Sequence, residues 1–460
     1  MDFLSILNAI QGFIQELGAT VMMPIIICIM GIILKAGIGK SIRAGLTVGV
    51  GFIGLNLVIS AMGDNLGPAV QAMIERYGLQ LSVIDVGWPA AAAIAFASKV
   101  GMMIIPIGLV VNIIMLLTNT TQTVDIDIWD YWHFAFTGAL VAILTQSQVF
   151  GVVAAVLNMI IVMVIGDYTA PQVEESLGLP GVSLPHGFTG AYAPIAIVFN
   201  KIFDMIPGIK DIDINMEKVQ KRFGVFGEPI IVGTVLGIII GIIAGYKFSA
   251  VLLLGITLGG VLVLIPKMAA LLMEGLIPIS DAASEFIKNK FQNRGKIYIG
   301  LDSAVGVGHP ITLSISLILV PLTVFLAVII PGNKVLPFAD LAVIPWMFVL
   351  ITPVVRGNGF RGIIIGVIVL ALGLLIATDL SPMITEAARN ANFQMPEGAA
   401  AISSICDGAN PLTWVIVRLH GLGIIGTAIV TVIAIGLAAI NRMRIMKEAA
   451  VLHSGESEQM

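Results

Sequence analysis

The feature that most restricts the fold of this chain is a series of continuous apolar runs, each long enough to form a helix. A helix needs about 20 mostly apolar residues to cross a bilayer. The runs are Leu17–Leu34, Ala44–Met62, Val100–Thr118, Phe134–Ser147, Val149–Gly166, Ile230–Tyr246, Val251–Ile265, Ile311–Ile330, Leu341–Val355, Gly362–Ala377 and Gly423–Ile440. Only 11% of the 460 residues are charged, against roughly a quarter in soluble proteins. The sequence therefore predicts an all-α polytopic membrane protein with about ten or eleven transmembrane helices plus re-entrant segments.

Two segments interrupt this apolar pattern in a similar way. The first, Val83–Pro89, contains Asp85, Gly87 and Trp88 before its proline, and the second, Tyr298–Pro310, contains Asp302 and His309. Glycine and proline both disfavour a regular helix. In lipid, an unwound backbone survives only where protein buries it or where it lines a watered cavity. We therefore expect both segments to lie at a site inside the protein.

The two interrupted segments are part of a wider internal similarity. Six pairs of landmarks recur in the same order at offsets of 212 to 217 residues: Gly63 with Gly275, Asp85 with Asp302, Pro106 with Pro321, Asp127 with Asp340, Trp132 with Trp346, and Asp167 with Asp379. Residues 63–82, expected to form a loop, contain one basic residue, whereas the equivalent loop 267–296 contains five. Because positive charge marks cytoplasmic loops, we predict an inverted repeat. Its units are a first half (1–205), a cytoplasmic linker with an amphipathic helix (206–228), a second half (229–445) and a polar cytoplasmic tail (446–460).

Basic residues also predict the orientation of the chain in the membrane. Lys35, Lys40 and Arg43 follow the first apolar run, and Arg442 and Arg444 follow the last. The positive-inside rule then puts the N-terminus outside and the C-terminus in the cytoplasm.

Asp85 and Asp302 are the first candidates for ligand binding, because ionisable residues inside a membrane protein are commonly functional. A carboxylate accepts hydrogen bonds from neighbouring hydroxyls, which suits a sugar or polyol. Trp88 offers an apolar ring face for the C–H side of such a ligand. The alternatives are a structural helix cap or a buried partner for the aspartates, and an interface anchor for Trp88.

Three of the five histidines lie beside a helix breaker or at the start of an apolar run. His186 precedes Gly187, His309 precedes a proline, and His133 opens a run in which Thr137 lies four residues further on. Residues four apart share one face of a helix, so His133 and Thr137 are predicted to point the same way. Each histidine is a candidate for the site, with a structural bridge between helices as the alternative.

Several function classes find no support in the sequence. There is no ATP-binding glycine-rich loop, no nucleophile arrangement of Ser, His and Asp, and no cluster with metal-ligand spacing. Cys28 and Cys406 form no CxxC pattern. We therefore expect no cofactor, no metal and no nucleic-acid partner.

Six motifs resemble the galactitol-type membrane component IIC of the phosphotransferase system (PTS), and the similarity extends over about residues 15 to 445. The motifs are Val83-Ile-Asp-Val-Gly-Trp-Pro89, Asp125-Ile-Asp-Ile-Trp129, Pro185-His-Gly187, Phe223-Gly-x-Phe-Gly-Glu-Pro229, Ile299-Gly-Leu-Asp302 and Pro331-Gly-Asn-x-Val-Leu-Pro-Phe-x-Asp-Leu341. The resemblance implies a homodimer in the bacterial cytoplasmic membrane, similar in fold to the ascorbate IIC transporters. It also implies a scaffold domain and a mobile core that carries the substrate like an elevator.

The same resemblance implies a reaction and its partners. A phosphocysteine on a separate IIB protein, recharged by IIA, would phosphorylate the polyol at the cytoplasmic face, so this chain would be the translocating subunit of a sugar phosphotransferase. Substrate-binding positions carried over from the ascorbate relatives are Gly87, Trp88, His133, Thr137, His186, Gly187 and Asp302. Either Asp302 or a neutral His186 would orient the acceptor hydroxyl.

Three alternatives stay open at this stage. The substrate is galactitol, ascorbate, a pentitol or another sugar. The protein is alternatively a cation-coupled secondary polyol transporter, with Asp85 and Asp302 as proton or sodium sites. A channel or a sensor is a third class, although channels are commonly built around a symmetric pore ring.

Overall fold

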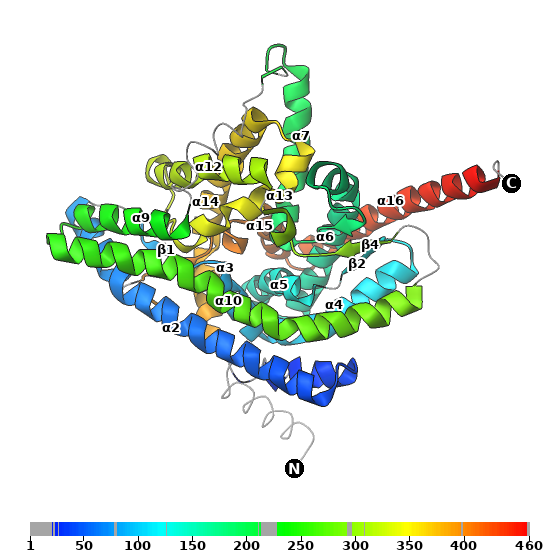
Figure 1. Ribbon diagram of the computed structural model, residues 1–460, viewed down its shortest axis with the longest axis horizontal. Coiled ribbons are helices and arrows are strands. Elements are labelled where there is room, and N and C mark those ends of the chain that lie inside the picture. The colour runs from blue at the N-terminus through cyan, green and yellow to red at the C-terminus, as the bar shows by residue number, and fades with distance from the viewer. Residues whose placement is uncertain are drawn as a thin grey trace.

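The computed structural model describes residues 21–457 apart from 22–23, 26, 78–80, 126, 210, 213–227, 292–296, 308 and 397–398. Helices dominate it (Figure 1). They are α2 (Ile38–Tyr77), α3 (Trp88–Ala97), α4 (Lys99–Leu117), α5 (Tyr131–Thr145), α6 (Gln148–Leu177), α7 (Gly187–Met205), α9 (Pro229–Ile243), α10 (Phe248–Phe291), α11 (Ala304–Val307), α12 (Pro310–Ile329), α13 (Ile344–Val354), α14 (Gly359–Asn390), α15 (Pro411–His420) and α16 (Ile424–Ser457). Short 3-10 helices are η1 (Ile128–Asp130), η3 (Ala339–Val343) and η4 (Asp407–Ala409).

The prediction of an all-α membrane protein is confirmed. Within the described residues, seven helices are long and apolar enough to cross a bilayer, and three shorter apolar helices accompany them at Trp88–Ala97, Ile230–Ile243 and Ala339–Val354. Large apolar side chains stay exposed on the outer helices, as at Leu46 and Leu57 of α2, which are 65% and 67% accessible. Such residues are stable against lipid tails. The count of ten or eleven spans stays a prediction.

Two helices are much longer than the sequence suggested. The expected loops 63–82 and 267–296 instead continue α2 to Tyr77 and α10 to Phe291. The two helices lie side by side along one edge of the molecule, with α9 next to α10 (Figure 1). Val48 of α2 packs at Gly275 of α10, and Met268 of α10 packs at Gly54 of α2. Tertiary packing of this kind outweighs the local signals of Pro68 and the polar residues that predicted a loop.

The interrupted segments form two small parallel sheets. One contains β1 (Val83–Asp85) between β5 (Val335–Leu336) and β6 (Ala401–Ser403), and the other contains β4 (Tyr298–Gly300) between β2 (Thr123–Asp125) and β3 (Val182–Ser183). In each sheet, the central strand belongs to one half of the chain and both outer strands belong to the other half. The two halves are therefore joined by backbone hydrogen bonds at both breaks.

Other predicted segments differ or lie outside the described residues. The segment predicted as a polar cytoplasmic tail, 446–460, is helical as far as Ser457, because α16 continues into it, and α16 extends away from the rest of the helices (Figure 1). The predicted amphipathic helix of the linker, at 213–222, lies outside the described residues, as does the N-terminal segment 1–20.

Candidate functional site

A small cavity of about 50 Å³ lies where the broken segments of both halves meet. The first half contributes Trp88, Trp129, Trp132, His133, His186 and Phe188, and the second contributes Asp302, Ala304, Val343, Trp346 and Cys406. Among the residues that the structure describes, none of those lining the cavity is a lysine or an arginine. The cavity therefore combines aromatic walls with histidine and carboxylate groups.

Tryptophan rings form much of the wall. Trp88 begins α3, and its ring meets that of Trp129 edge-on, with centroids 6.1 Å apart. The Phe96 ring packs against that of Trp129, with centroids 5.7 Å apart. The centroids of the Trp132 and His133 rings are 4.0 Å apart. Aromatic rings are large, rigid apolar surfaces, so the wall suits the C–H faces of a polyhydroxylated ligand.

His133 lies in the first turn of α5 and makes a short bond across the two halves. Its Nδ1 is 2.6 Å from Oδ2 of Asp407, and both side chains are almost completely buried. Its Nε2 is buried without a hydrogen-bond partner in the described structure. The His133 ring also lies 4.4 Å from the ring of His186. The two histidines are thus neighbours on one cavity wall.

His186 caps the N-terminus of α7. Its Nδ1 accepts a hydrogen bond from the backbone N–H of Thr189 at 3.4 Å. Its Nε2 lies 3.5 Å from Oδ1 of Asp302 and 3.7 Å from Oδ1 of Asp130. Burial, followed by the neighbouring His133, lowers the pKa of His186 well below its usual value.

Asp127, Asp130 and Asp302 form an acidic cluster, with one carboxylate oxygen of each lying within 4.8 Å of the others. Burial and then the Asp302 carboxylate raise the pKa of Asp127 to about 6. Burial also raises the pKa of Asp130 and that of Asp302. Both oxygens of Asp130 are buried without a hydrogen-bond partner among the described residues. Such a cluster needs a proton, a hydroxyl donor or a cation to stabilise its charge.

Asp85 lies away from the cavity lining and is fully buried. Its Oδ2 accepts the backbone N–H groups of Phe338 and Asp340, both at 2.9 Å, and its Oδ1 accepts those of Gly87 at 3.2 Å and Ile405 at 3.4 Å. Three of these four bonds tie β1 to the two second-half segments beside it, and the fourth, from Gly87, is local. The structure therefore favours the structural alternative for Asp85.

Gly87 makes the sharp turn between β1 and α3, with φ at 87°, a value that side chains disfavour. The turn directs the Trp88 ring to the cavity, while the Trp88 backbone N–H donates to Oδ1 of Asp340 at 2.6 Å. A reciprocal bond occurs in the other half, where the Asp302 N–H donates to Oδ2 of Asp127 at 3.3 Å. Gly87 therefore contributes to the cavity through its backbone conformation, which orients Trp88, and not through a side chain.

The remaining predicted residues have different positions. Thr137 lies one turn beyond His133, bonded to Thr413 Oγ1 at 2.8 Å and Asn158 Nδ2 at 2.7 Å, and does not line the cavity. Gly187 lies against the His133 side chain, where an added methyl group would overlap it. His309 caps α12 outside the cavity lining. The structure thus brings together Trp88, His133, His186 and Asp302.

Comparison with known proteins gives the family. Residues 13–398 match the sequence profile described as EIIC-GAT, PTS system sugar-specific permease component. The chain belongs to this EIIC-GAT family. An Escherichia coli K12 protein named as a permease IIC component is 42% identical over 427 residues, which are 93% of this chain and 96% of that protein. The galactitol-specific EIIC components of E. coli K12 and O157:H7 are each 40% identical over 412 residues, 90% of this chain and 91% of theirs.

The EIIC-GAT chain has site residues that sequence reasoning did not select. Asp130, Trp129, Trp132 and Trp346 lie at or beside the cavity, and Asp407 holds His133. Trp132 and Trp346 carry one signal in the sequence, as a landmark pair of the internal repeat. The Asp407 partnership has no such signal, because 274 residues separate it from His133.

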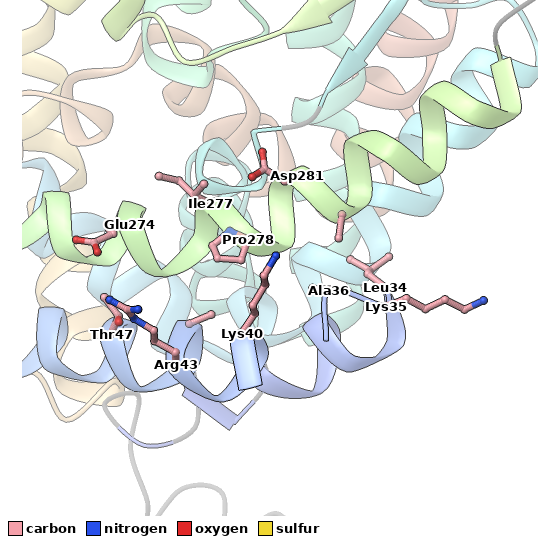
Figure 2. Close-up of a pocket in the computed structure, with 12 residues that line it drawn as sticks. Leu34, Lys35, Ala36, Lys40, Arg43, Thr47, Glu274, Ile277, Pro278 and Asp281 are labelled. Atoms are coloured by element: carbon pink, nitrogen blue, oxygen red, sulfur yellow. The ribbon is translucent and has the colours of Figure 1, made fainter. Parts of the chain in front are cut away.

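A larger hollow of this EIIC-GAT protein, about 740 Å³, lies between the start of α2 and the middle of α10. Figure 2 shows Lys40 pointing from α2 toward α10, and Glu274 and Asp281 on the facing helix. Its remaining walls are mostly aliphatic, without the aromatic rings and histidines of the smaller cavity. We therefore assign the chemistry to the smaller cavity.

Proposed function

We propose that the chain imports galactitol or a related polyol and presents it for phosphorylation by a phosphocysteine on a separate IIB protein. Family membership and the galactitol-specific relatives support the substrate class. The observation that carries the proposal is the cavity itself, where tryptophan rings lie beside Asp302, His133 and His186. Carboxylate and imidazole groups hydrogen-bond hydroxyls, and the rings cover the carbon skeleton.

The charge of the cavity favours an uncharged ligand over ascorbate. Ascorbate is an anion at neutral pH and would need a basic partner, but no lysine or arginine of the described residues lines the cavity. Asp302 and Asp130, when ionised, would repel it. A neutral polyol instead donates its hydroxyl protons to these carboxylates. A charged product formed inside the cell would be trapped, because charges cross apolar paths poorly.

The size of the cavity supports a moving core. A volume of about 50 Å³ holds one or two water molecules rather than a sugar, since ligand pockets typically begin at about 300 Å³. Both halves contribute to its lining, so the segments around it must rearrange to admit a polyol. The reciprocal strand order of the two sheets supports an inverted repeat, in the arrangement that elevator and rocking transporters share. A homodimer, an external N-terminus and a cytoplasmic C-terminus complete the proposal.

Cation-coupled transport is the second candidate, favoured by the acidic cluster Asp127, Asp130 and Asp302 with its unpartnered oxygens. A bound proton or sodium ion would neutralise these carboxylates. In this case the polyol would accumulate unmodified, driven by an ion gradient.

One experiment separates the two candidates. Radiolabelled galactitol is offered to membrane vesicles containing the chain, with and without IIB, IIA and the upstream phosphoryl donors, and the internal label is identified chemically. Galactitol phosphate that forms only with IIB supports group translocation. Free galactitol that accumulates without IIB and is lost on adding an uncoupler refutes it and supports cation coupling.

A further inference from the structure

The two cavity histidines differ in which ring nitrogen is free. In a neutral imidazole, one nitrogen carries the proton and the other accepts a hydrogen bond. Nδ1 of His186 already accepts the N–H of Thr189 at 3.4 Å, so its Nε2 carries the proton and faces the carboxylates of Asp302 and Asp130. A neutral His186 therefore has no lone pair left for a substrate hydroxyl.

His133 has the opposite arrangement. Its Nδ1 lies 2.6 Å from Oδ2 of Asp407, and a carboxylate only accepts hydrogen bonds, so Nδ1 carries the proton. The lone pair is then on Nε2, which is buried without a hydrogen-bond partner in the described structure. Because His133 lines the cavity, this lone pair is available to a ligand there.

The second half of the chain holds Asp407 in place. Asn410 donates from Nδ2 to Oδ1 of Asp407 at 3.2 Å and to the carbonyl of Gly187 at 3.0 Å. The Oδ1 of Asn410 caps α15 by accepting the N–H groups of Leu412 and Thr413, both at 3.0 Å. Asn410 therefore holds the Asp407 carboxylate in place, and the N-terminus of α15 holds Asn410.

Two close neighbours restrict the His133 ring as well. Gly187 contacts the His133 side chain so closely that a methyl group has no space there. The Trp132 ring also packs against it, with centroids 4.0 Å apart and the planes tilted by 32°. A ring held on several sides keeps its free nitrogen in one position, which catalysis by proton transfer requires.

We propose that His133 is the general base of the phosphoryl transfer, accepting the hydroxyl proton of the polyol on Nε2, and that Asp407 is the residue that positions it. This inference rests on the proposed function and deepens it. It also replaces the earlier expectation that Asp302 or His186 orients the acceptor hydroxyl.

The chemical step balances with the phosphocysteine as donor. The polyol hydroxyl oxygen forms a bond to phosphorus, and the phosphorus–sulfur bond breaks. The cysteine leaves as a thiolate with the bonding electron pair, and the hydroxyl proton moves to Nε2 of His133. The imidazolium is stabilised by Asp407 and then returns its proton to water or to the thiolate.

The test measures a single turnover of phosphoryl transfer from phosphorylated IIB to radiolabelled galactitol, in vesicles containing the full chain. Asp407→Asn and His133→Gln are expected to lower the rate constant about 10²- to 10⁴-fold, the usual contribution of a positioned base. Galactitol affinity is expected to stay within about three-fold, because the general base acts mainly in the transition state. Asp407→Glu restores part of the rate.

Asp379→Asn is the matched control. Asp379 is also a paired aspartate of the second half, bonded to Trp414 Nε1 at 2.7 Å and Arg418 Nε at 2.8 Å, but it is solvent-exposed. We expect its transfer rate to stay within about two-fold of wild type, as for most exposed substitutions.

Each result has one meaning. Transfer by Asp407→Asn or His133→Gln within about three-fold of wild type overturns the proposed base. Equal losses of galactitol affinity and rate also overturn it, because they indicate a binding role alone. If neither variant folds, Asp407→Glu decides, and a transfer rate equal to that of wild type overturns the positioning role. No transfer by wild type refutes the proposed function itself.

Discussion

Asp85→Asn is expected to destabilise the protein strongly, because the Asp85 carboxylate serves four backbone N–H groups. An asparagine has one oxygen, so its NH₂ group must face either Phe338 and Asp340 or Gly87 and Ile405. In both orientations, two buried N–H groups lose their acceptor. Each buried donor left unsatisfied costs about 1–3 kcal/mol, so the expected loss in the free energy of unfolding is about 2–6 kcal/mol.

The measurement is thermal melting in detergent, followed by size-exclusion chromatography, with Asp302→Asn as the matched control. Asp302 Oδ1 accepts one backbone N–H, from Ala304 at 2.7 Å, and an amide oxygen replaces it well. Asp302→Asn should therefore melt like wild type but lose galactitol uptake, whereas Asp85→Asn should melt early. If Asp85→Asn melts within about 1 °C of wild type, a shift equivalent to about 1 kcal/mol for a chain of 460 residues, while losing uptake, Asp85 is a ligand residue and its structural role is refuted.

Two further predictions concern the neighbourhood of the cavity. Gly187→Ala should displace His133 and cost about 1–3 kcal/mol, as overpacking does, with a loss of phosphoryl transfer; Gly190→Ala is its control, because the nearest atoms to the new methyl group lie 3.8 Å away. Equal transfer rates in the two variants would contradict this. The pKa of Asp127 is raised in the folded protein to about 6 from 3.8, so its contribution to stability is lost as pH rises from about 4 through about 6. Wild type should therefore lose about 1 kcal/mol between pH 5 and 7 that Asp127→Asn does not lose, and parallel melting curves against pH for the two proteins would show the reasoning to be wrong.

The sequence was sufficient for the fold class and for part of the site. The run Val100–Thr118 became α4 (Lys99–Leu117), and Ile311–Ile330 became α12 (Pro310–Ile329), almost residue for residue. The length of the apolar run alone identifies such helices, because in lipid every backbone N–H and C=O group must form its hydrogen bond within the same segment. Trp88, His133, His186 and Asp302 were selected as candidates because polar and aromatic residues at helix breaks are rare in an apolar chain, and the structure places all four at one cavity.

What the sequence could not predict depends on contacts between distant segments. The sequence around a buried aspartate does not indicate whether its oxygens bind a ligand or accept backbone N–H groups. Asp85 was expected to bind a ligand, but its oxygens accept backbone N–H groups. The continuation of α2 beyond Met62 depends on packing against α10, which no local pattern contains. The pairing of His133 with Asp407 likewise requires knowing which break of the second half faces α5.

The reciprocal strand order has a consequence for biosynthesis. While the chain is being inserted, β1 has no partner strand until residues 335–336 and 401–403 have been synthesised. Until then, Asp85 also lacks the backbone N–H groups of Phe338 and Asp340 as hydrogen-bond donors. The first half therefore leaves the ribosome with an open strand and with an Asp85 carboxyl group that lacks most of its hydrogen-bond donors, and only the second half supplies the missing partners. We expect the two halves to mature as one unit, with the polyol site as the last part of the protein to form.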